Sequence, residues 1–386
     1  MIYLDNSATT QAFDSVIQVM GRAMQETYFN PSALYGPGLA SDKAMGQVRG
    51  QIASALGDPG LKVIFTAGGT ESNNLALMGL VPSLKGKKGH FITTAMEHPS
   101  VARVADALKA QGHRVDYLSV EDRGRVQLDQ LESLLTEDTT AVSIMQVNNE
   151  TGVLQDLAAL GQCIRRKAPQ CLFHIDGVQG FMREPISLTQ VGADLYSLSA
   201  HKIHGPKGIG ALAMTPRAQS ALSPILFGGG QEGGLRSGTP NVPAILGLGE
   251  ATARFAVQGA QWRRQMMQLK LRLVQGLRAQ LPGVWVNGPD PESGAAHIVN
   301  LSFEGIRGEV LLHALEGEGI LVSTGSACSS HAHRASGVLV SQGVTPARAG
   351  QAIRISLSVM TTQEEIDTAI EIIRAQVTRL ARFKRR

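Results

Sequence analysis

The feature that most constrains this fold is an alternation of short apolar runs with helix-like segments between about residues 60 and 215. Amphipathic stretches such as 100–111 and 156–167 separate several of the runs. Strands that alternate with helices build a parallel sheet covered by those helices. We therefore predict an α/β fold with a mainly parallel seven-stranded sheet. The expected strands are 62–65, 90–93, 114–118, 141–144, 172–175, 195–198 and 209–212.

A second, smaller set of elements follows a glycine-rich passage at 227–238. A chain of 386 residues exceeds the size that one hydrophobic core usually serves, so two domains are expected. We predict a large domain at 15–255 and a smaller α/β domain from 1–14 and 256–386. The later elements are expected as strands at 298–303, 320–323 and 354–357 and helices at 261–280, 309–316 and 362–382.

Composition limits the binding partners and the cellular compartment that we expect for this protein. A net charge of +4 is too small to indicate nucleic acid, so no direct nucleic-acid partner is expected. No apolar run approaches the roughly 20 residues of a membrane helix, and no signal-peptide pattern opens the chain, so no membrane association is expected. Three cysteines, Cys163, Cys171 and Cys328, are a poor basis for a disulfide framework. Cys163 and Cys171 are interpreted as structural, and a reducing cytoplasm is expected.

Polar side chains follow the carboxyl ends of the predicted strands, where open α/β sheets bind ligands. Lys202, in Ser-Ala-His-Lys, directly follows a strand and offers an amine for a Schiff base. Asp176 ends a buried strand and is suited to holding a pyridine nitrogen protonated, although a helix-capping role is the alternative. Gln179, one turn later, is placed to donate to a phenolic ring oxygen. Together these residues indicate pyridoxal-phosphate chemistry.

Further segments contain residues that are suited to binding a phosphate group or to stacking on an aromatic ring. Gly69 and Thr70 lie in a glycine turn that opens a helix, where free N–H groups attract anions; a simple capping box at Thr70 is the equal alternative. Ser199 and His201 flank the lysine and are expected to add phosphate contacts. His98 lies where a strand gives way to a helix and is a candidate to stack on a ring and to exchange protons.

Arg354 lies among apolar residues in a predicted strand, so its charge needs a partner. A substrate carboxylate would satisfy it by bidentate pairing. An internal Arg–Glu pair is the equal alternative. Asn149, in Val-Asn-Asn-Glu-Thr-Gly, is a candidate to bind the same carboxylate.

The third cysteine, Cys328, lies in the Ser/Gly-rich run Ser-Thr-Gly-Ser-Ala-Cys-Ser-Ser. Few apolar residues anchor this loop, so we expect it to be mobile and its thiol to serve as a second nucleophile. His331 and His333 nearby leave open a metal site with Cys328. We expect no metal, because a three-ligand cluster without a further cysteine is a weak signal.

Ordered motifs across most of the chain resemble the cysteine desulfurases of the class V aminotransferase superfamily, in the group with a long, mobile cysteine loop. The resemblance rests on segments from both halves of the chain. They are Tyr3–Thr10, Asn30–Ser32, Gly69–Asn74, Glu97–His98, Asn148–Glu150, Asp176–Gln179, Ser199–Lys202, Gly228–Glu232, Arg236–Asn241 and the strand around Arg354.

The resemblance implies a fold-type I pyridoxal-phosphate enzyme and a homodimer, with the cofactor on Lys202. It assigns Asp176 to the pyridine nitrogen, Gln179 to the phenolic oxygen and His98 to the ring face. The phosphate contacts would come from Gly69, Thr70, Ser199 and His201, and from Thr239 of the other subunit. Asn149 and Arg354 would bind the substrate carboxylate.

In that family Cys328 would take sulfur from L-cysteine, leave L-alanine and pass a persulfide to a sulfur-acceptor protein, for iron–sulfur assembly or tRNA thiolation. Two other functions stay open. A selenocysteine lyase or aminotransferase would use the same cofactor, and a non-catalytic scaffold would bind the acceptor protein without turnover.

Overall fold

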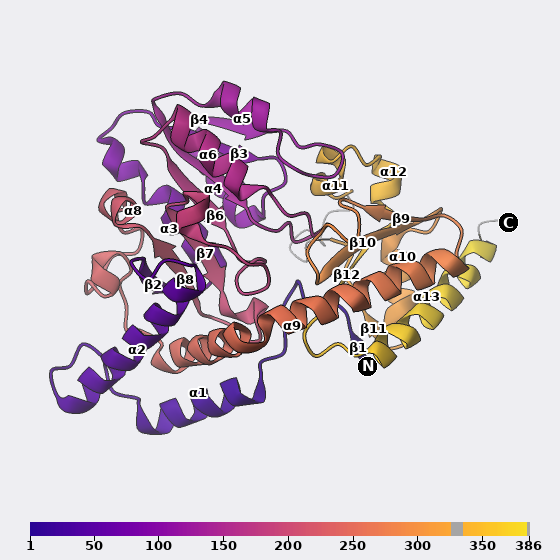
Figure 1. The fold of residues 1–386 in the computed structure, drawn as a ribbon, viewed down its shortest axis with the longest axis horizontal. Helices are drawn as coiled ribbons and strands as arrows, with labels where there is room; N and C mark the ends of the chain where they lie inside the picture. Colours follow the sequence, from indigo (N-terminus) through magenta and orange to yellow (C-terminus); the bar gives the residue numbers. More distant parts are fainter. Residues whose placement is uncertain (326–334, 384–386) are drawn as a thin grey trace.

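The computed structural model describes residues 1–325 and 335–383. Its centre is a seven-stranded sheet in the order β2-β8-β7-β6-β5-β3-β4 (Figure 1). Six strands run in one direction, and only β8 is antiparallel to its neighbours β2 and β7. The predicted α/β class and mainly parallel sheet are confirmed.

Each predicted strand of this sheet is present, within two residues of its expected ends. All but the edge strand β4 are largely buried, because helices cover both faces and exclude water from the apolar runs. The strands are β2 Lys62–Thr66, β3 His90–Thr94, β4 Arg114–Leu118, β5 Thr139–Met145, β6 Leu172–Asp176, β7 Leu195–Ser199 and β8 Gly210–Met214.

The two faces of the sheet bury different hydrophobic clusters. On one face, α3 (Gly69–Met78) and α4 (Pro99–Ala110) pack their apolar residues against the strands. On the other, α2 (Gly36–Ala55) and α6 (Leu157–Lys167) contribute to a larger cluster. Cys163 and Cys171 are free thiols buried in this larger cluster, which confirms their structural interpretation.

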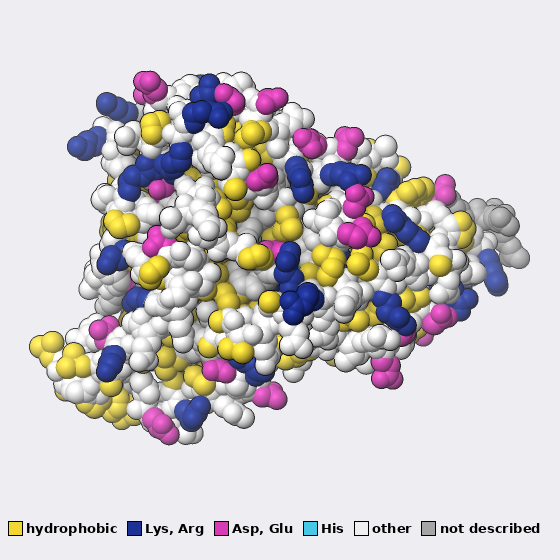
Figure 2. Space-filling model, viewed as in Figure 1, with side chains coloured by type: hydrophobic (Ala, Val, Ile, Leu, Met, Phe, Trp, Pro, Cys, Tyr) yellow, Lys and Arg dark blue, Asp and Glu magenta, His cyan; other side chains and the backbone are white. Residues whose placement is uncertain are grey.

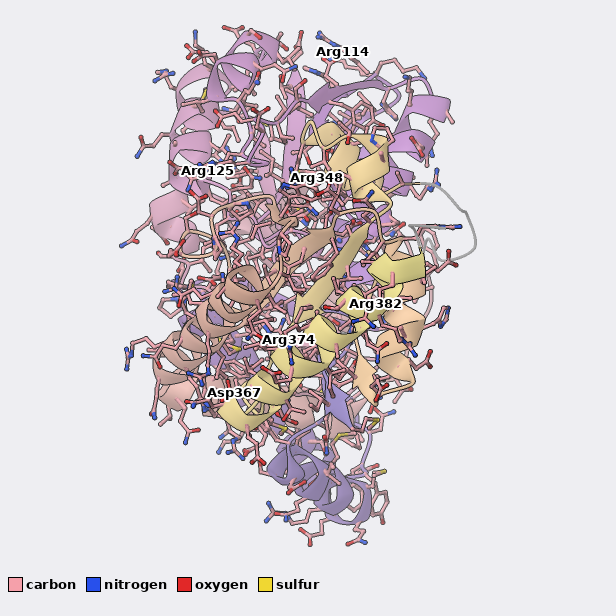
Figure 3. All side chains as sticks on the ribbon, turned by 90° about the vertical axis from the view of Figure 1, so that its right-hand side faces the viewer. Arg114, Arg125, Arg348, Asp367, Arg374 and Arg382 are labelled. Atoms are coloured by element: carbon pink, nitrogen blue, oxygen red, sulfur yellow. The ribbon has the colours of Figure 1, made fainter. Side chains whose placement is uncertain are left out.

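A third cluster holds the smaller set of elements together. It packs α10 (Gly308–Glu316) and α13 (Gln363–Phe383) against a three-stranded antiparallel sheet and the parallel pair β1–β11. Figure 3 shows Asp367, Arg374 and Arg382 along α13, whose charged side chains face solvent. The strands are β1 Ile2–Tyr3, β9 Val284–Asn287, β10 Ile298–Phe303, β11 Ile320–Leu321 and β12 Ala352–Ser356.

One long helix, α9 (Val242–Gln280), joins the two parts (Figure 1). It begins 19 residues before the predicted helix at 261, and it crosses residue 255 without a break, so the predicted domain boundary stays a prediction. The first half of α9 contains Gly247 and Gly249. Because glycine is unfavourable in helices, the sequence of this half was less clearly helical. A Cβ on Gly249 would lie 2.6 Å from Val48, so these glycines let α9 approach its neighbours closely.

The remaining elements are short and lie around these clusters. No helix among the described residues is long and apolar enough to cross a membrane. The elements are α1 Asp14–Glu26, α5 Leu128–Leu134, α7 Leu188–Val191, α8 Pro216–Ala221, α11 Gly337–Ser341, α12 Pro346–Ala349 and the 3₁₀ turns η1 Val81–Leu84, η2 Ala200–Lys202 and η3 Glu232–Gly234.

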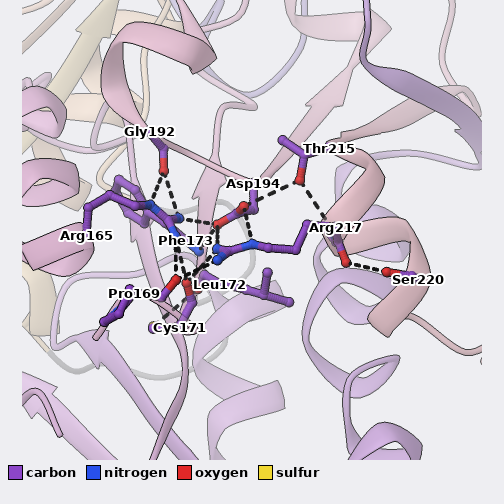
Figure 4. Close-up of polar contacts among 11 residues, drawn as sticks. Arg165, Pro169, Cys171, Leu172, Phe173, Gly192, Asp194, Thr215, Arg217 and Ser220 are labelled. Carbon is purple, nitrogen blue, oxygen red and sulfur yellow. Dashed lines mark hydrogen bonds and ion pairs between the residues drawn. The ribbon is translucent and has the colours of Figure 1, made fainter. Parts of the chain in front are cut away.

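A cluster of charged residues lies at the amino ends of β6 and β7 in the main sheet (Figure 4). Asp194, directly before β7, is nearly buried and pairs with Arg165 of α6 and Arg217 of α8. Its carboxylate also accepts the Phe173 N–H at 2.8 Å. Because one carboxylate binds residues of two helices and a strand, Asp194 links α6, α8 and β6.

Candidate active site

A cavity of about 240 Å³ lies at the carboxyl ends of β5, β6 and β7. Ten of the twelve residues singled out from the sequence line it, although they come from distant parts of the chain. The ten are Gly69, Thr70, His98, Asn149, Asp176, Gln179, Ser199, His201, Lys202 and Arg354.

Lys202 projects into this cavity from η2, the turn that directly follows β7. Its Nζ donates to the carbonyl oxygens of Ser7 at 2.5 Å and Ala8 at 2.8 Å. Burial, together with the positive charges of Arg183 and Arg354, lowers the pKa of Lys202 from 10.5 to about 7. The amine is therefore partly neutral at physiological pH, as a nucleophile must be.

Asp176 ends β6 and is nearly buried. Its Oδ2 accepts from Nδ2 of Asn73 at 2.7 Å, and its Oδ1 accepts from the Val178 N–H at 3.0 Å. No cation pairs with it among the described residues. A buried carboxylate that faces a cavity in this way suits a cationic ring nitrogen.

His98 precedes α4 and lies on the same cavity. Its Nδ1 is 2.8 Å from Ser100 Oγ and accepts the Ser100 N–H at 3.1 Å. Burial and the charge of Lys202 lower the pKa of His98 below 6.5, against the opposing effect of Asp176. The imidazole is therefore held neutral beside the cavity.

The amino end of α3 forms the corner expected to bind phosphate. The helix begins at Gly69, and its cap residue is Gly68, so the alternative of a capping box at Thr70 is wrong. A Cβ on Gly69 would lie 2.4 Å from Cγ2 of Val178, which leaves only glycine to fit between α3 and the cavity floor. The free N–H groups there, with Ser199 and His201 beside them, suit an anion. These residues and Asp176 fit pyridoxal phosphate.

Arg354, in the middle of β12, is almost fully buried and lines the cavity. Its Nη2 donates to Asp5 Oδ1 at 2.5 Å and its Nη1 donates to the carbonyl oxygen of Asn149 at 3.0 Å. Arg354 thus forms an internal ion pair, as the alternative expected, but its partner is Asp5 and not a glutamate. The Arg354 Nε–H is buried and bonds to none of the described residues.

Two predicted residues, Thr239 and Cys328, are not among these ten. Thr239 is exposed in the loop before α9 and does not line the cavity of its own chain. Cys328 lies outside the described residues, as do His331 and His333, so the alternative of a metal site there is not tested. No group of metal-ligating side chains occurs in residues 1–325 and 335–383.

Several site residues were missed in the sequence. Asp5 and the Ser7–Ala8 carbonyls come from the N-terminal segment, which the family motif at 3–10 signalled without assigning a role. Arg183 is buried beside the site, where its Nη1 donates to Gln179 Oε1 at 3.2 Å. Nothing in the sequence distinguishes Arg183 from a surface arginine.

Comparisons with known proteins agree with this geometry. The family described as aminotransferase class-V matches residues 2–368. The chain belongs to this family. Class-V aminotransferases of this kind depend on pyridoxal phosphate, so the predicted cofactor and fold type are confirmed.

Curated relatives within the class-V family are similar over nearly their whole length. "Cysteine desulfurase 2" of Trichormus variabilis is 40% identical over 380 residues, which cover 98% of this chain and 94% of that protein. "Cysteine desulfurase IscS" of Methanosarcina thermophila is 39% identical, with 98% of this chain and 92% of that protein covered.

Solved structures show the same likeness. One named "NifS-like protein" is 36% identical with a TM-score of 0.90, covering 98% of this chain and 99% of its own. Another, titled "SspA in complex with cysteine", is 32% identical with a TM-score of 0.82, covering 94% of this chain and 100% of its own. The recognised resemblance to cysteine desulfurases is confirmed.

Proposed function

We propose that this protein is a cysteine desulfurase that converts L-cysteine to L-alanine and carries the sulfur as a persulfide on Cys328. The observation that carries the proposal is one cavity that is lined by Lys202, Asp176 and Arg354 together. The proposal is also supported by an identity of roughly 40% to relatives that are named cysteine desulfurases.

Pyridoxal phosphate, when bound, supplies an electron sink that stabilises a carbanion at the substrate. In our proposal Lys202 anchors the cofactor, Asp176 holds the ring nitrogen protonated, and Gln179 donates to the phenolic oxygen. With a pKa of about 7, the released Lys202 amine is suited to removing the substrate α-proton near neutral pH.

Arg354 and Asn149 orient the substrate in this proposal. The guanidinium is held in place by Asp5 and by the Asn149 carbonyl, and its buried Nε–H has no partner among the described residues. Because the arginine is buried and already oriented, little side-chain entropy is lost when cysteine binds.

The sulfur step involves Cys328. Its thiolate attacks the substrate sulfur, an S–S bond forms and the C–S bond breaks. The electron pair of the broken bond remains on the substrate β-carbon, which takes up a proton and becomes the methyl group, and the proton that Lys202 removed returns to Cα to complete alanine. The sulfur stays on the enzyme as the Cys328 persulfide.

The described residues before Cys328 support its access to the site. Ser323 pairs with Arg354 through two backbone hydrogen bonds, so the chain passes beside the substrate-binding arginine. Gly325 is three residues from Cys328, a span of roughly 10 Å at most when fully extended. This path of the described chain supports the access of Cys328 to the site in our proposal.

We also propose a homodimer in which Thr239 contacts the cofactor phosphate of the other subunit. Large hydrophobic side chains are exposed where α1 joins α2 and in the loop after α8, including Tyr28, Leu34 and Phe227. Figure 2 shows hydrophobic atoms gathered at the α1–α2 end, at the lower left. Such patches are typical of subunit interfaces.

Mixing two inactive variants tests the shared site. If Thr239 acts across the interface, a heterodimer of Lys202→Ala and Thr239→Val chains contains one intact site and one doubly altered site. Each heterodimer should then have about half of the wild-type activity, so a randomly exchanged equimolar mixture, half of whose dimers are heterodimers, should recover about a quarter. Recovery that never exceeds the sum of the two separate variants would place Thr239 and Lys202 in the same subunit.

The activity itself is tested by mass spectrometry after incubation with L-cysteine. Wild type should gain one sulfur on Cys328 and release alanine. Lys202→Ala should lose the cofactor absorbance and the reaction, while Cys328→Ser should keep the absorbance but form no persulfide. Cys163→Ala, which changes a buried cysteine away from the site, is the matched control and should behave as wild type. Alanine release by Cys328→Ser at the wild-type rate would indicate the lyase alternative, and formation of a 2-oxo acid in place of alanine would indicate the aminotransferase alternative.

The acceptor is proposed only by class: a sulfur-acceptor protein that serves iron–sulfur cluster assembly or tRNA thiolation, in the cytoplasm. Relatives named IscS support this class. Trapping the persulfidated enzyme with candidate acceptors distinguishes the two, since the sulfur would move to only one of them.

A further inference from the structure

A continuous chain of hydrogen bonds connects the two polar groups on either side of the cavity. Asp176 Oδ2 accepts from Asn73 Nδ2 at 2.7 Å, and the same Nδ2 donates to Ser100 Oγ at 2.8 Å. Ser100 Oγ is in turn 2.8 Å from His98 Nδ1. Asn73 is fully buried, and Ser100 and Asp176 nearly so.

The direction of each bond follows from the chemistry of its atoms. An ionised carboxylate only accepts hydrogen bonds, so the Asn73 amide must turn its NH₂ group, and not its oxygen, towards Asp176. The second proton of that NH₂ group then occupies a lone pair of Ser100 Oγ. The Ser100 hydroxyl proton is left to donate to His98 Nδ1.

A second, independent donor reaches the same nitrogen. The Ser100 backbone N–H lies 3.1 Å from His98 Nδ1, and a backbone N–H can only donate. His98 Nδ1 must therefore carry a lone pair. Burial, which lowers the pKa of His98, agrees with a neutral ring. The single ring proton is then on Nε2.

We propose that Asn73 and Ser100 are positioning residues that hold His98 in the tautomer with its proton on Nε2 and couple it to Asp176. Nε2 bonds to none of the described residues, and His98 lines the cavity. The ring therefore offers the site an N–H donor and no free lone pair. This inference rests on the proposed function only in assigning that donor to the substrate or cofactor.

Lys202 and His98 have different roles because their protonation states differ. Lys202, with a pKa of about 7, is available as a base. His98 in this tautomer can donate a hydrogen bond through Nε2 but cannot accept one there. The two groups therefore do not compete for the same proton when substrate binds.

Nitrogen-15 NMR of the cofactor-loaded protein, labelled in its histidine rings, tests the tautomer directly. The chain has ten histidines, and His98→Gln identifies the His98 signals by their loss. We expect an unprotonated Nδ1 and a protonated Nε2 at pH 7. A protonated Nδ1, or a doubly protonated ring, would overturn the proposal whether or not the protein desulfurates cysteine.

Ser100 variants test the positioning. Ser100→Ala should move the Nδ1 signal and lower kcat by about fivefold, the factor for one hydrogen bond of about 1 kcal/mol, with little change in KM. Ser100→Thr keeps the hydroxyl and should restore both values. Ser220→Ala, on the exposed α8, is the matched control and should change neither. An unchanged Nδ1 signal in Ser100→Ala would show that the hydroxyl does not donate to His98.

Discussion

Glu97 provides the sharpest test of the electrostatics around the site. Its side chain is buried beside Asp176, and its Oε1 accepts from Thr94 Oγ1 at 2.9 Å and from the Met145 N–H at 3.0 Å. Burial, and then the negative charge of Asp176, raise the pKa of Glu97 from 4.5 to about 8. The native protein therefore holds a proton on Glu97 at neutral pH.

The raised pKa makes stability depend on pH. Between pH 4.5 and 8 the unfolded chain releases the Glu97 proton and the native state keeps it, so the free energy of unfolding falls as pH rises. This contribution is fully present below pH 4.5 and is lost as pH rises through 8. The slope is at most about 1.4 kcal/mol per pH unit, or about 2.7 kcal/mol between pH 5.5 and 7.5.

Glu97→Gln removes this dependence and keeps the shape of the side chain. The free energy of unfolding of Glu97→Gln minus that of wild type should therefore increase by about 2.7 kcal/mol as the pH rises from 5.5 to 7.5. Urea unfolding followed by fluorescence of the two tryptophans measures it, at equal protein concentrations. Glu137→Gln, on the exposed surface, controls for the lost carboxylate. Parallel pH curves for wild type and Glu97→Gln would refute a protonated Glu97.

Three other changes probe the packing and the charges. Asp194→Ala should lower the free energy of unfolding by about 3 kcal/mol in urea, since both of its arginine partners lose their carboxylate; a loss under 1 kcal/mol would contradict this. Gly177→Ala puts a Cβ 1.9 Å from Cζ of Tyr196 and should lower the melting temperature; an unchanged melting temperature would show that the site has room. Arg183→Met removes a buried cation, so the pKa of Lys202 should rise above about 7. Amine labelling of cofactor-free protein across pH measures that shift, and an unchanged labelling midpoint would exclude Arg183 as a cause.

The strands of the main sheet could be predicted because burial on both faces requires continuous apolar runs, which are visible in the sequence. The first half of α9 could not, because Gly247 and Gly249 are explained only by the helices packed against them. Likewise, the need of Arg354 for a partner was predictable from its apolar strand. Its pairing with Asp5, 349 residues away, was not.

For the site, the sequence by itself determined the residue types and their positions after strands, and the family motifs assigned roles to them. Only the tertiary structure decided how these groups act on one another. Hydrogen-bond direction and pKa depend on distance and burial, which arise when remote segments meet. That is why the proton on His98, the partly neutral Lys202 and the role of Asn73 follow from the fold and not from the order of residues.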